Sequence, residues 1–129
     1  MTAKTSALII GLIFIAVGLL GFIDNPIIGT SDKAIFHADT MHNAVHIGSG
    51  ILFLLFALAA PGSASGFLII FGIVYLAIGV LGLISFGTQG MGKVLGILHV
   101  NGADNILHVV LGVVIFIAGI ASRKSVPAR

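Results

Sequence analysis

"GFLIIFGIVYLAIGVLGLISF" forms residues 66–86, a run of 21 residues without a charged side chain. A helix of about 20 apolar residues spans the ~30 Å hydrocarbon layer of a membrane, so this stretch predicts a transmembrane helix. Similar stretches occupy 6–23, 40–60 and 103–122. A membrane β-barrel would instead show short segments of alternating polarity. We therefore predict an all-α membrane protein in which four transmembrane helices form a single domain over 1–129.

The composition supports a membrane location. Hydrophobic residues make up 58% of the 129 residues and charged residues only 8%, whereas soluble domains carry about 25% charged residues. Cysteine is absent, which excludes disulfides, thiolate metal sites and thiol nucleophiles. The net charge is only +2, and no basic cluster is interleaved with aromatic residues. The expected partner is the lipid bilayer, with no nucleic acid.

The cations predict the orientation in the membrane. Four of the six lie near the chain ends, at Lys4, Arg123, Lys124 and Arg129. The loops at 24–39 and 87–102 hold one lysine each. Because cytoplasmic ends of membrane helices carry the excess of Lys and Arg, we expect both termini in the cytoplasm of a bacterial cell. The two loops, which hold histidines, would then face the periplasm or the exterior.

The chain has the pattern of a tandem duplication. "GLIFIAVGLLGFI" at 11–23 matches "GIVYLAIGVLGLI" at 72–84 at six of thirteen positions, and all three glycines coincide. "HADTMHNAVHIGSG" at 37–50 aligns with "HVNGADNILHVVLG" at 99–112, where polar residues match as well. Each copy contains a helix, an outer loop and a second helix, so we predict two tandem helical hairpins.

Both copies would enter the membrane in the same direction. Parallel repeats of this kind are related by a pseudo-twofold axis along the membrane normal. We expect that relation between repeats at about 6–60 and 66–122. It places His46 and His108 at equal depth, and the aligned glycines give each repeat a small-residue face for close helix packing.

Polar residues gather where the second and fourth stretches begin. His42 and His46 stand four residues apart, as do Asp104 and His108, so each pair lies on one face of its helix. Polar side chains in a membrane helix turn toward the protein interior, because lipid cannot satisfy them. We expect these four side chains to meet between the repeats.

One interpretation of this cluster is structural. Its members would hydrogen-bond each other and the free backbone groups at the helix starts. The candidate N-caps are Asp39 and Thr40 for one helix, and Asn101 and Asp104 for the other. Asn43 and Asn105 would bridge the two repeats as buried polar residues.

A second interpretation is a bound metal ion. Three imidazoles and one carboxylate suit zinc, copper or iron, and helical bundles can present such ligands from facing helices. The candidate ligands are His42, His46, Asp104 and His108, with His37 and His99 in the loops above as extra ligands or a lid.

Two further alternatives stay open. A haem b could be held between His46 and His108, since their equal depth suits axial ligation. Titrating imidazoles could instead relay protons, but Ser49, Ser85 and Tyr75 are poor members of such a relay. The polar site therefore has the pattern of a cup open to the outside, without a path through the membrane.

No catalytic motif is visible, so we predict that the protein is not an enzyme. The sequence lacks a G-x-S-x-G nucleophile elbow and a phosphate-binding glycine loop between a strand and a helix. "GTQGMGKVLG" at 87–96 holds several glycines and a lysine, but it lies between two membrane stretches. We interpret it as a flexible turn.

The histidine motifs resemble a known family. "HIGSG" at 46–50, "HVVLG" at 108–112 and "NGADNILH" at 101–108 are similar to motifs of small four-helix membrane proteins of actinobacteria and cyanobacteria, an uncharacterised domain of unknown function. The most specific match is Asp-Asn-x-Leu-His, at Asp104, Asn105, Leu107 and His108. "HNAVH" fits more loosely, because His42 stands where the family pattern has an acidic or small polar residue. The resemblance covers nearly the whole chain and implies the topology without a reaction.

The sequence thus predicts a small integral inner-membrane protein with an outward-facing His/Asp/Asn cluster that is structural or binds a metal. A different class of function is also open. The chain could be an accessory subunit of a larger membrane complex, or a homo-oligomer, whose apolar outer faces pack on other helices.

Overall fold

Four long helices dominate the computed structural model, which describes residues 1–31 and 33–124. They are α1 (Ala3–Leu20), α2 (Thr40–Ala59), α3 (Ala64–Phe86) and α4 (Gly102–Lys124). Each is long and apolar enough to cross a membrane. The predicted all-α fold with four transmembrane helices is confirmed.

Short elements connect the helices. They are β1 (Ile28–Gly29), β2 (Phe36–His37), the 3-10 helix η1 (Pro61–Ser63), β3 (Met91–Val94) and β4 (Leu98–Asn101). β1 pairs with β2 in parallel, and β3 pairs with β4 in an antiparallel hairpin. The flexible turn predicted for 87–96 was therefore wrong in part, because β3 lies within it. A strand of four residues is too short for its alternation to stand out among glycines.

Side-chain caps decide where the helices begin. Thr2 Oγ1 accepts a hydrogen bond from the Thr5 amide at 3.1 Å, so α1 begins three residues before the predicted position. Asp39 is the N-cap of α2, and its Oδ1 accepts from the His42 amide at 2.9 Å. These bonds satisfy amides that lack a partner in the first helical turn.

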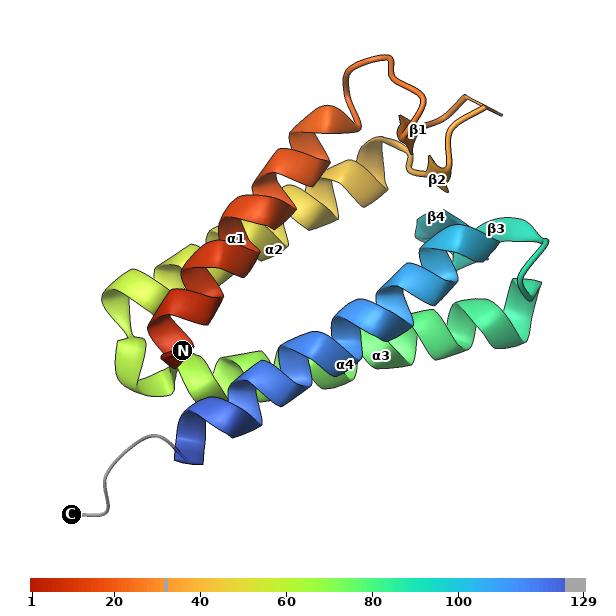
Figure 1. Ribbon diagram of the computed structural model, residues 1–129. Coiled ribbons are helices and arrows are strands. Elements are labelled where there is room, and N and C mark those ends of the chain that lie inside the picture. The colour runs from red at the N-terminus through yellow and green to blue at the C-terminus, as the bar shows by residue number, and fades with distance from the viewer. Residues whose placement is uncertain (32, 125–129) are drawn as a thin grey trace.

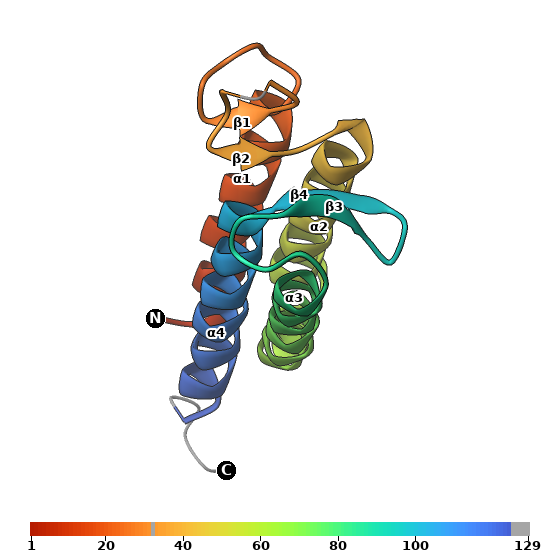
Figure 2. The same ribbon diagram turned by 90° about the vertical axis from the view of Figure 1, so that its right-hand side faces the viewer.

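The helices form two hairpins, α1 with α2 and α3 with α4, which pack mainly within themselves. In Figure 1 the hairpins are joined through η1 and run at an angle to each other. Both strand pairs lie at the end of the bundle away from η1, and the N-terminus and the end of α4 lie toward the η1 end (Figures 1 and 2). The loops at 24–39 and 87–102 therefore meet at one end of the molecule.

Glycine pairs allow the helices of each hairpin to approach closely. A Cβ on Gly11 would lie 2.9 Å from Gly50 O, and a Cβ on Gly72 would lie 2.8 Å from Gly112 O. Close backbone approach of this kind is a common way for helices to associate in lipid. The predicted role of these glycines in helix packing is confirmed at both crossings.

The buried core is apolar and partly aromatic. Phe53, Leu68 and Ile115 are at most 1% exposed, and the Phe14 ring packs on Phe53 and Tyr75 with centroids 5.4 and 5.2 Å apart. Large apolar side chains also cover the outer faces of the helices. Such all-round hydrophobicity is typical of helices that face lipid on one side and a core on the other.

We predict that Gly72→Ala destabilises the protein while Gly48→Ala does not. A Cβ at position 72 would lie 2.5 Å from Phe116 N and 2.7 Å from Phe116 Cα, so α3 and α4 must separate. Overpacking typically costs about 1–3 kcal/mol. A Cβ at Gly48 meets nothing within 4 Å, and alanine favours a helix by up to about 1 kcal/mol over glycine.

The free energy of unfolding in detergent micelles checks this prediction. Equal stability of the Gly72→Ala and Gly48→Ala proteins would contradict the close crossing of α3 and α4.

Candidate functional site

Three histidines from two helices form a cluster near the strand-bearing end of the bundle. His42 and His46 lie on α2 and His108 lies on α4. One ring nitrogen from each can be chosen so that all three lie within 4.8 Å of one another. The ring centroids are 4.7 Å apart for His42–His46, 5.4 Å for His42–His108 and 6.1 Å for His46–His108. The structure thus brings together three of the four predicted ligands.

The helical repeat explains this arrangement. His46 follows His42 by one helical turn, so both rings project from the same face of α2. His108 lies one turn after Asp104 and faces that pair from α4. The Phe14 ring packs on His46 and the Tyr75 ring on His108, both with centroids 5.6 Å apart. The cluster therefore lies directly on the aromatic part of the core.

The cluster holds buried polar atoms without partners. His42 is 1% exposed and His108 is 3% exposed, whereas His46 is half-buried. His42 Nε2, His46 Nε2 and His108 Nδ1 are buried and have no hydrogen-bond partner among the described residues. Buried polar atoms are nearly always paired, and each unpaired group costs free energy. A bound group that contacts these three nitrogens would supply the partners that they lack.

One backbone contact orients the His42 ring. Its Nδ1 lies 2.8 Å from the carbonyl oxygen of His99 in β4. A carbonyl can only accept, so Nδ1 carries the proton and donates, and the neutral ring then has its lone pair on Nε2. Histidines that bind metals commonly donate their other ring nitrogen to a carbonyl in this way.

Asp104, the fourth predicted ligand, forms hydrogen bonds with backbone amides, unlike the three clustered histidine nitrogens. Its Oδ2 accepts from the Asn101 amide at 2.9 Å and from the His37 amide at 3.0 Å. Asn101 Oδ1 accepts in return from the Asp104 amide at 3.0 Å. This reciprocal pair is a capping box at the start of α4, and the His37 bond ties the first outer loop to it.

His37 and His99 lie above the cluster, in β2 and β4. Their rings pack edge to face with centroids 4.1 Å apart. A second bond, from Asn101 Nδ2 to Ile35 O at 3.0 Å, also joins the two outer loops. The loops thus form a cover over the cluster, as a lid would, and neither ring belongs to the group of three.

Asn43 and Asn105 are buried, but each packs against a glycine of its own hairpin. A Cβ on Gly21 would collide with the Asn43 side chain, and one on Gly82 with that of Asn105. Asn105 Nδ2 also donates to Gly87 O at 3.5 Å. These contacts lie within each hairpin, and the expectation that the two asparagines bridge the repeats stays a prediction.

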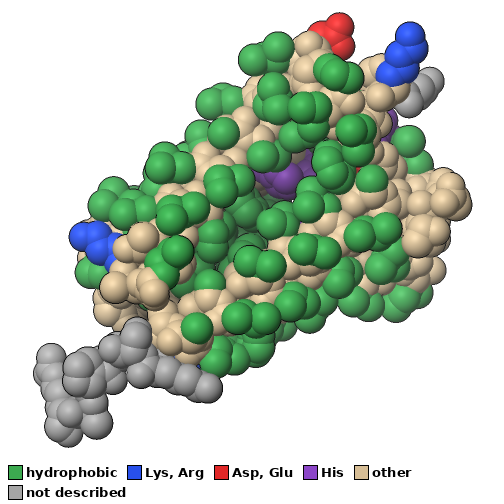
Figure 3. Space-filling view, in the orientation of Figure 1, with side chains coloured by type: hydrophobic (Ala, Val, Ile, Leu, Met, Phe, Trp, Pro, Cys, Tyr) green, Lys and Arg blue, Asp and Glu red, His purple; other side chains and the backbone are tan. Residues whose placement is uncertain are grey.

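A groove leads to the cluster from the side of the bundle. It has a volume of about 260 Å³ and is lined by Val17 and Leu20 of α1, Leu107 of α4, and His42 and His46. Figure 3 shows histidine side chains at the bottom of a hollow between the two hairpins, with hydrophobic side chains around it. Behind the cluster, beside Tyr75, is a space of only about 10 Å³, close to the size of one water.

The cluster does not continue toward the other end of the membrane. Below it lie the buried Phe14, Tyr75 and Phe53 rings. Tyr75 and Ser49 make the next polar contact, with 3.4 Å between their oxygens. This arrangement fits a cup that closes in the core and disfavours a proton path. It also disfavours haem, because the His42 ring contacts both His46 and His108 and would block a porphyrin between them.

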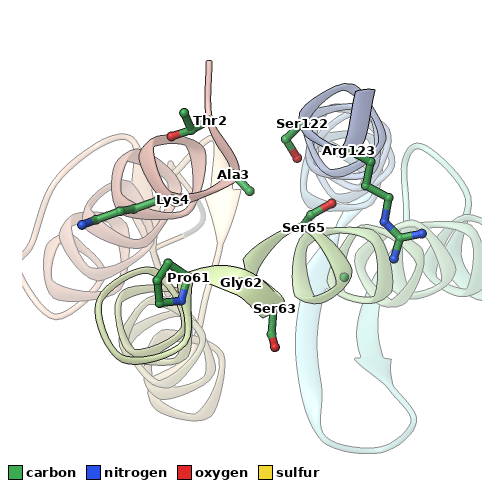
Figure 4. Close-up of a pocket in the computed structure, with 10 residues that line it drawn as sticks. Thr2, Ala3, Lys4, Pro61, Gly62, Ser63, Ser65, Ser122 and Arg123 are labelled. Atoms are coloured by element: carbon green, nitrogen blue, oxygen red, sulfur yellow. The ribbon is translucent and has the colours of Figure 1, made fainter. Parts of the chain in front are cut away.

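A second cavity, of about 630 Å³, lies at the η1 end of the bundle. Lys4 and Arg123 contribute to its lining, but their side chains point away from each other (Figure 4). Both residues are exposed. This cavity therefore offers less of a binding site than the histidine cluster does.

Comparison with known proteins agrees with the resemblance seen in the sequence. The model of a family described as a domain of unknown function, DUF4383, matches residues 4–121. No curated protein and no solved structure matches the chain. Since the match covers nearly the whole chain, the protein belongs to the DUF4383 family.

Proposed function

We propose that this membrane protein binds one transition-metal ion through His42 Nε2, His46 Nε2 and His108 Nδ1. The observation that carries the proposal is that these three buried nitrogens lack partners in a cluster where each histidine has a ring nitrogen within 4.8 Å of one on the others. A purely structural cluster would use its ring nitrogens in hydrogen bonds, because lipid offers no alternative partner. The ion would supply the missing interaction for all three at once.

The donor set fits such an ion. Zinc binds imidazole nitrogens at about 2.0–2.1 Å in tetrahedral geometry, which places the donors about 3.3 Å apart. Here each histidine has a ring nitrogen within 4.8 Å of one on the other two, so the rings would need to move closer together around an ion. Neutral imidazoles suit zinc, copper and iron. Asp104 is not needed as a ligand, because its Oδ2 already accepts two amides.

We also propose that the two hairpins arose by duplication and are related by a pseudo-twofold axis. Residues that lie on such an axis meet their own counterparts. Three aligned pairs do so, with ring centroids at 4.1 Å for His37–His99, 6.1 Å for His46–His108 and 5.2 Å for Phe14–Tyr75. In an experimental structure, 11–50 should superpose on 72–112 by a rotation near 180° about the membrane normal, and a clearly different rotation would contradict the duplication.

The proposed orientation places the histidine end outside the cell. Lys4 and Arg123 lie at the η1 end, and the positive-inside rule assigns that end to the cytoplasm. All four acidic residues lie in or next to the loops at 24–39 and 87–102. The metal would then be bound about two turns below the outer surface, at 1.5 Å per helical residue.

We predict one metal ion per chain in protein purified without a His tag. Removing two ligands in His46→Ala/His108→Ala should weaken zinc binding at least ~100-fold, since loss of an outer-shell partner alone costs about 10–100-fold. His99→Ala is the matched control, because the hydrogen bond to His42 is made by the His99 backbone carbonyl, which alanine keeps. Binding should also weaken as the pH falls, because protons compete for the imidazole nitrogens.

Calorimetric titration with zinc, together with elemental analysis, checks the prediction. Absence of saturable binding, combined with a lower unfolding temperature of the double variant, would make the histidines structural. A Soret band in the absorption spectrum would instead indicate haem.

The orientation of the helices in the membrane has a separate test. The sequence contains no cysteine, so a thiol reagent can label only the cysteine that is introduced. We predict that a membrane-impermeant maleimide labels Ser31→Cys in intact cells and leaves Ser63→Cys unlabelled until the membrane is opened. Both serines are exposed, and they lie in the outer loop and in η1 respectively. The reverse pattern would invert the topology.

A further inference from the structure

We propose that the groove between α1 and α4 lets an apolar molecule dissolved in the bilayer place an oxygen donor on the metal. This inference rests on the metal site proposed above and adds the class of molecule that reaches it. The occupant is a molecule with a small oxygen-bearing head and a hydrocarbon body. Its head would fill the coordination position that three histidines leave open.

The position of the groove determines where its occupant comes from. Membrane-spanning helices form part of its walls, with Val17 and Leu20 on α1 and Leu107 on α4. The outer loop between α1 and α2 forms the rest, through Ile27, Ile28, Phe36 and Ala38. Val17 and Leu20 lie in the last turn of α1, and Leu107 lies in the second turn of α4. His46 lies at a similar distance from the start of α2. The groove therefore opens sideways, at the depth where one leaflet meets its headgroups.

The outer loops restrict access from water. Phe36 of β2 lines the groove on the loop side, and the His37 and His99 rings pack together above the cluster. The bond from the His37 amide to Asp104 holds the first loop down at 3.0 Å. A ligand that arrives through the side of the bundle meets mainly apolar side chains before it reaches the histidines. Asp104 also lines the groove, but its Oδ2 already accepts hydrogen bonds from the His37 and Asn101 amides.

The chemistry at the end of the groove determines the head of the occupant. His42 and His46 both line the groove, so the side of the ion without a protein ligand would face it. Zinc with three protein ligands typically takes an oxygen donor as the fourth. The volume of about 260 Å³ is below the usual ~300–1,000 Å³ of sites that enclose a whole ligand. Only the head and its first carbons would enter, while the remaining chain stays in lipid.

A pair of hydroxamates tests the route. Hydroxamates bind metals through two oxygens, and octanohydroxamic acid partitions into a bilayer while acetohydroxamic acid stays in water. The test uses cobalt-loaded protein in phosphatidylcholine nanodiscs. We expect octanohydroxamic acid to change the visible cobalt spectrum at a total concentration at least ~10-fold lower than acetohydroxamic acid requires, since each buried methylene contributes about 0.8 kcal/mol. The metal content after repurification shows that the ion stays in place.

Adjacent leucines provide matched variants. Leu20→Trp fills the groove, whereas Leu19→Trp adds the same side chain at a position that is 53% exposed and outside the groove. We expect Leu20→Trp to weaken the binding of octanohydroxamic acid at least ~10-fold while the affinity for cobalt stays unchanged. Leu19→Trp should change neither affinity. If Leu20→Trp does not fold, Val17→Phe blocks the same groove.

The outcomes separate the two proposals. Bound cobalt with equal responses to both hydroxamates, or with no difference between the two tryptophan variants, would overturn the lateral route and leave the metal site intact. Failure to bind cobalt, zinc or copper at all would overturn the metal site and the route together.

Discussion

A polar side chain inside a membrane must find its partners within the protein, because lipid offers none. In this chain the constraint acts where His42, His46 and His108 meet between two hairpins. Hydrogen bonds from the outer loops hold the surroundings of the cluster, with His42 Nδ1 bonded to the His99 carbonyl and the His37 amide bonded to Asp104. Three ring nitrogens are nevertheless left without partners among the described residues. The metal ion that we propose would resolve that imbalance.

The rest of the fold holds these histidines in place. Glycine pairs bring the helices of each hairpin into close backbone contact, at Gly11–Gly50 and Gly72–Gly112. An aromatic core closes the site from below, and the paired outer loops cover it. The remaining open side is a groove with mainly apolar walls. A site of this form is suited to exchange with the membrane rather than to transport across it.

Much of this architecture could be predicted from residue patterns. The apolar stretches predicted four helices to within a few residues, and the i, i+4 spacing of His42 and His46 placed both rings on one face. Local sequence narrowed the N-cap of α2 to Asp39 or Thr40, and the structure selects Asp39. The tertiary contacts could not be predicted in this way. Whether Asp104 ligates an ion or caps a helix depends on how closely the His37 loop approaches it. The strand pair β3–β4 and the packing of Asn105 within its own hairpin depend on such approaches too.

X-ray absorption spectroscopy at the zinc edge, on protein loaded with one equivalent of zinc in nanodiscs, tests the central claim most directly. Our account predicts an inner shell with three imidazole nitrogens at about 2.0–2.1 Å and one further light atom, which is the pattern of a three-histidine site with an open position. The scattering signature of the imidazole rings should decrease to one ring in His46→Ala/His108→Ala. A shell of oxygens alone, unchanged in the double variant, would contradict the account.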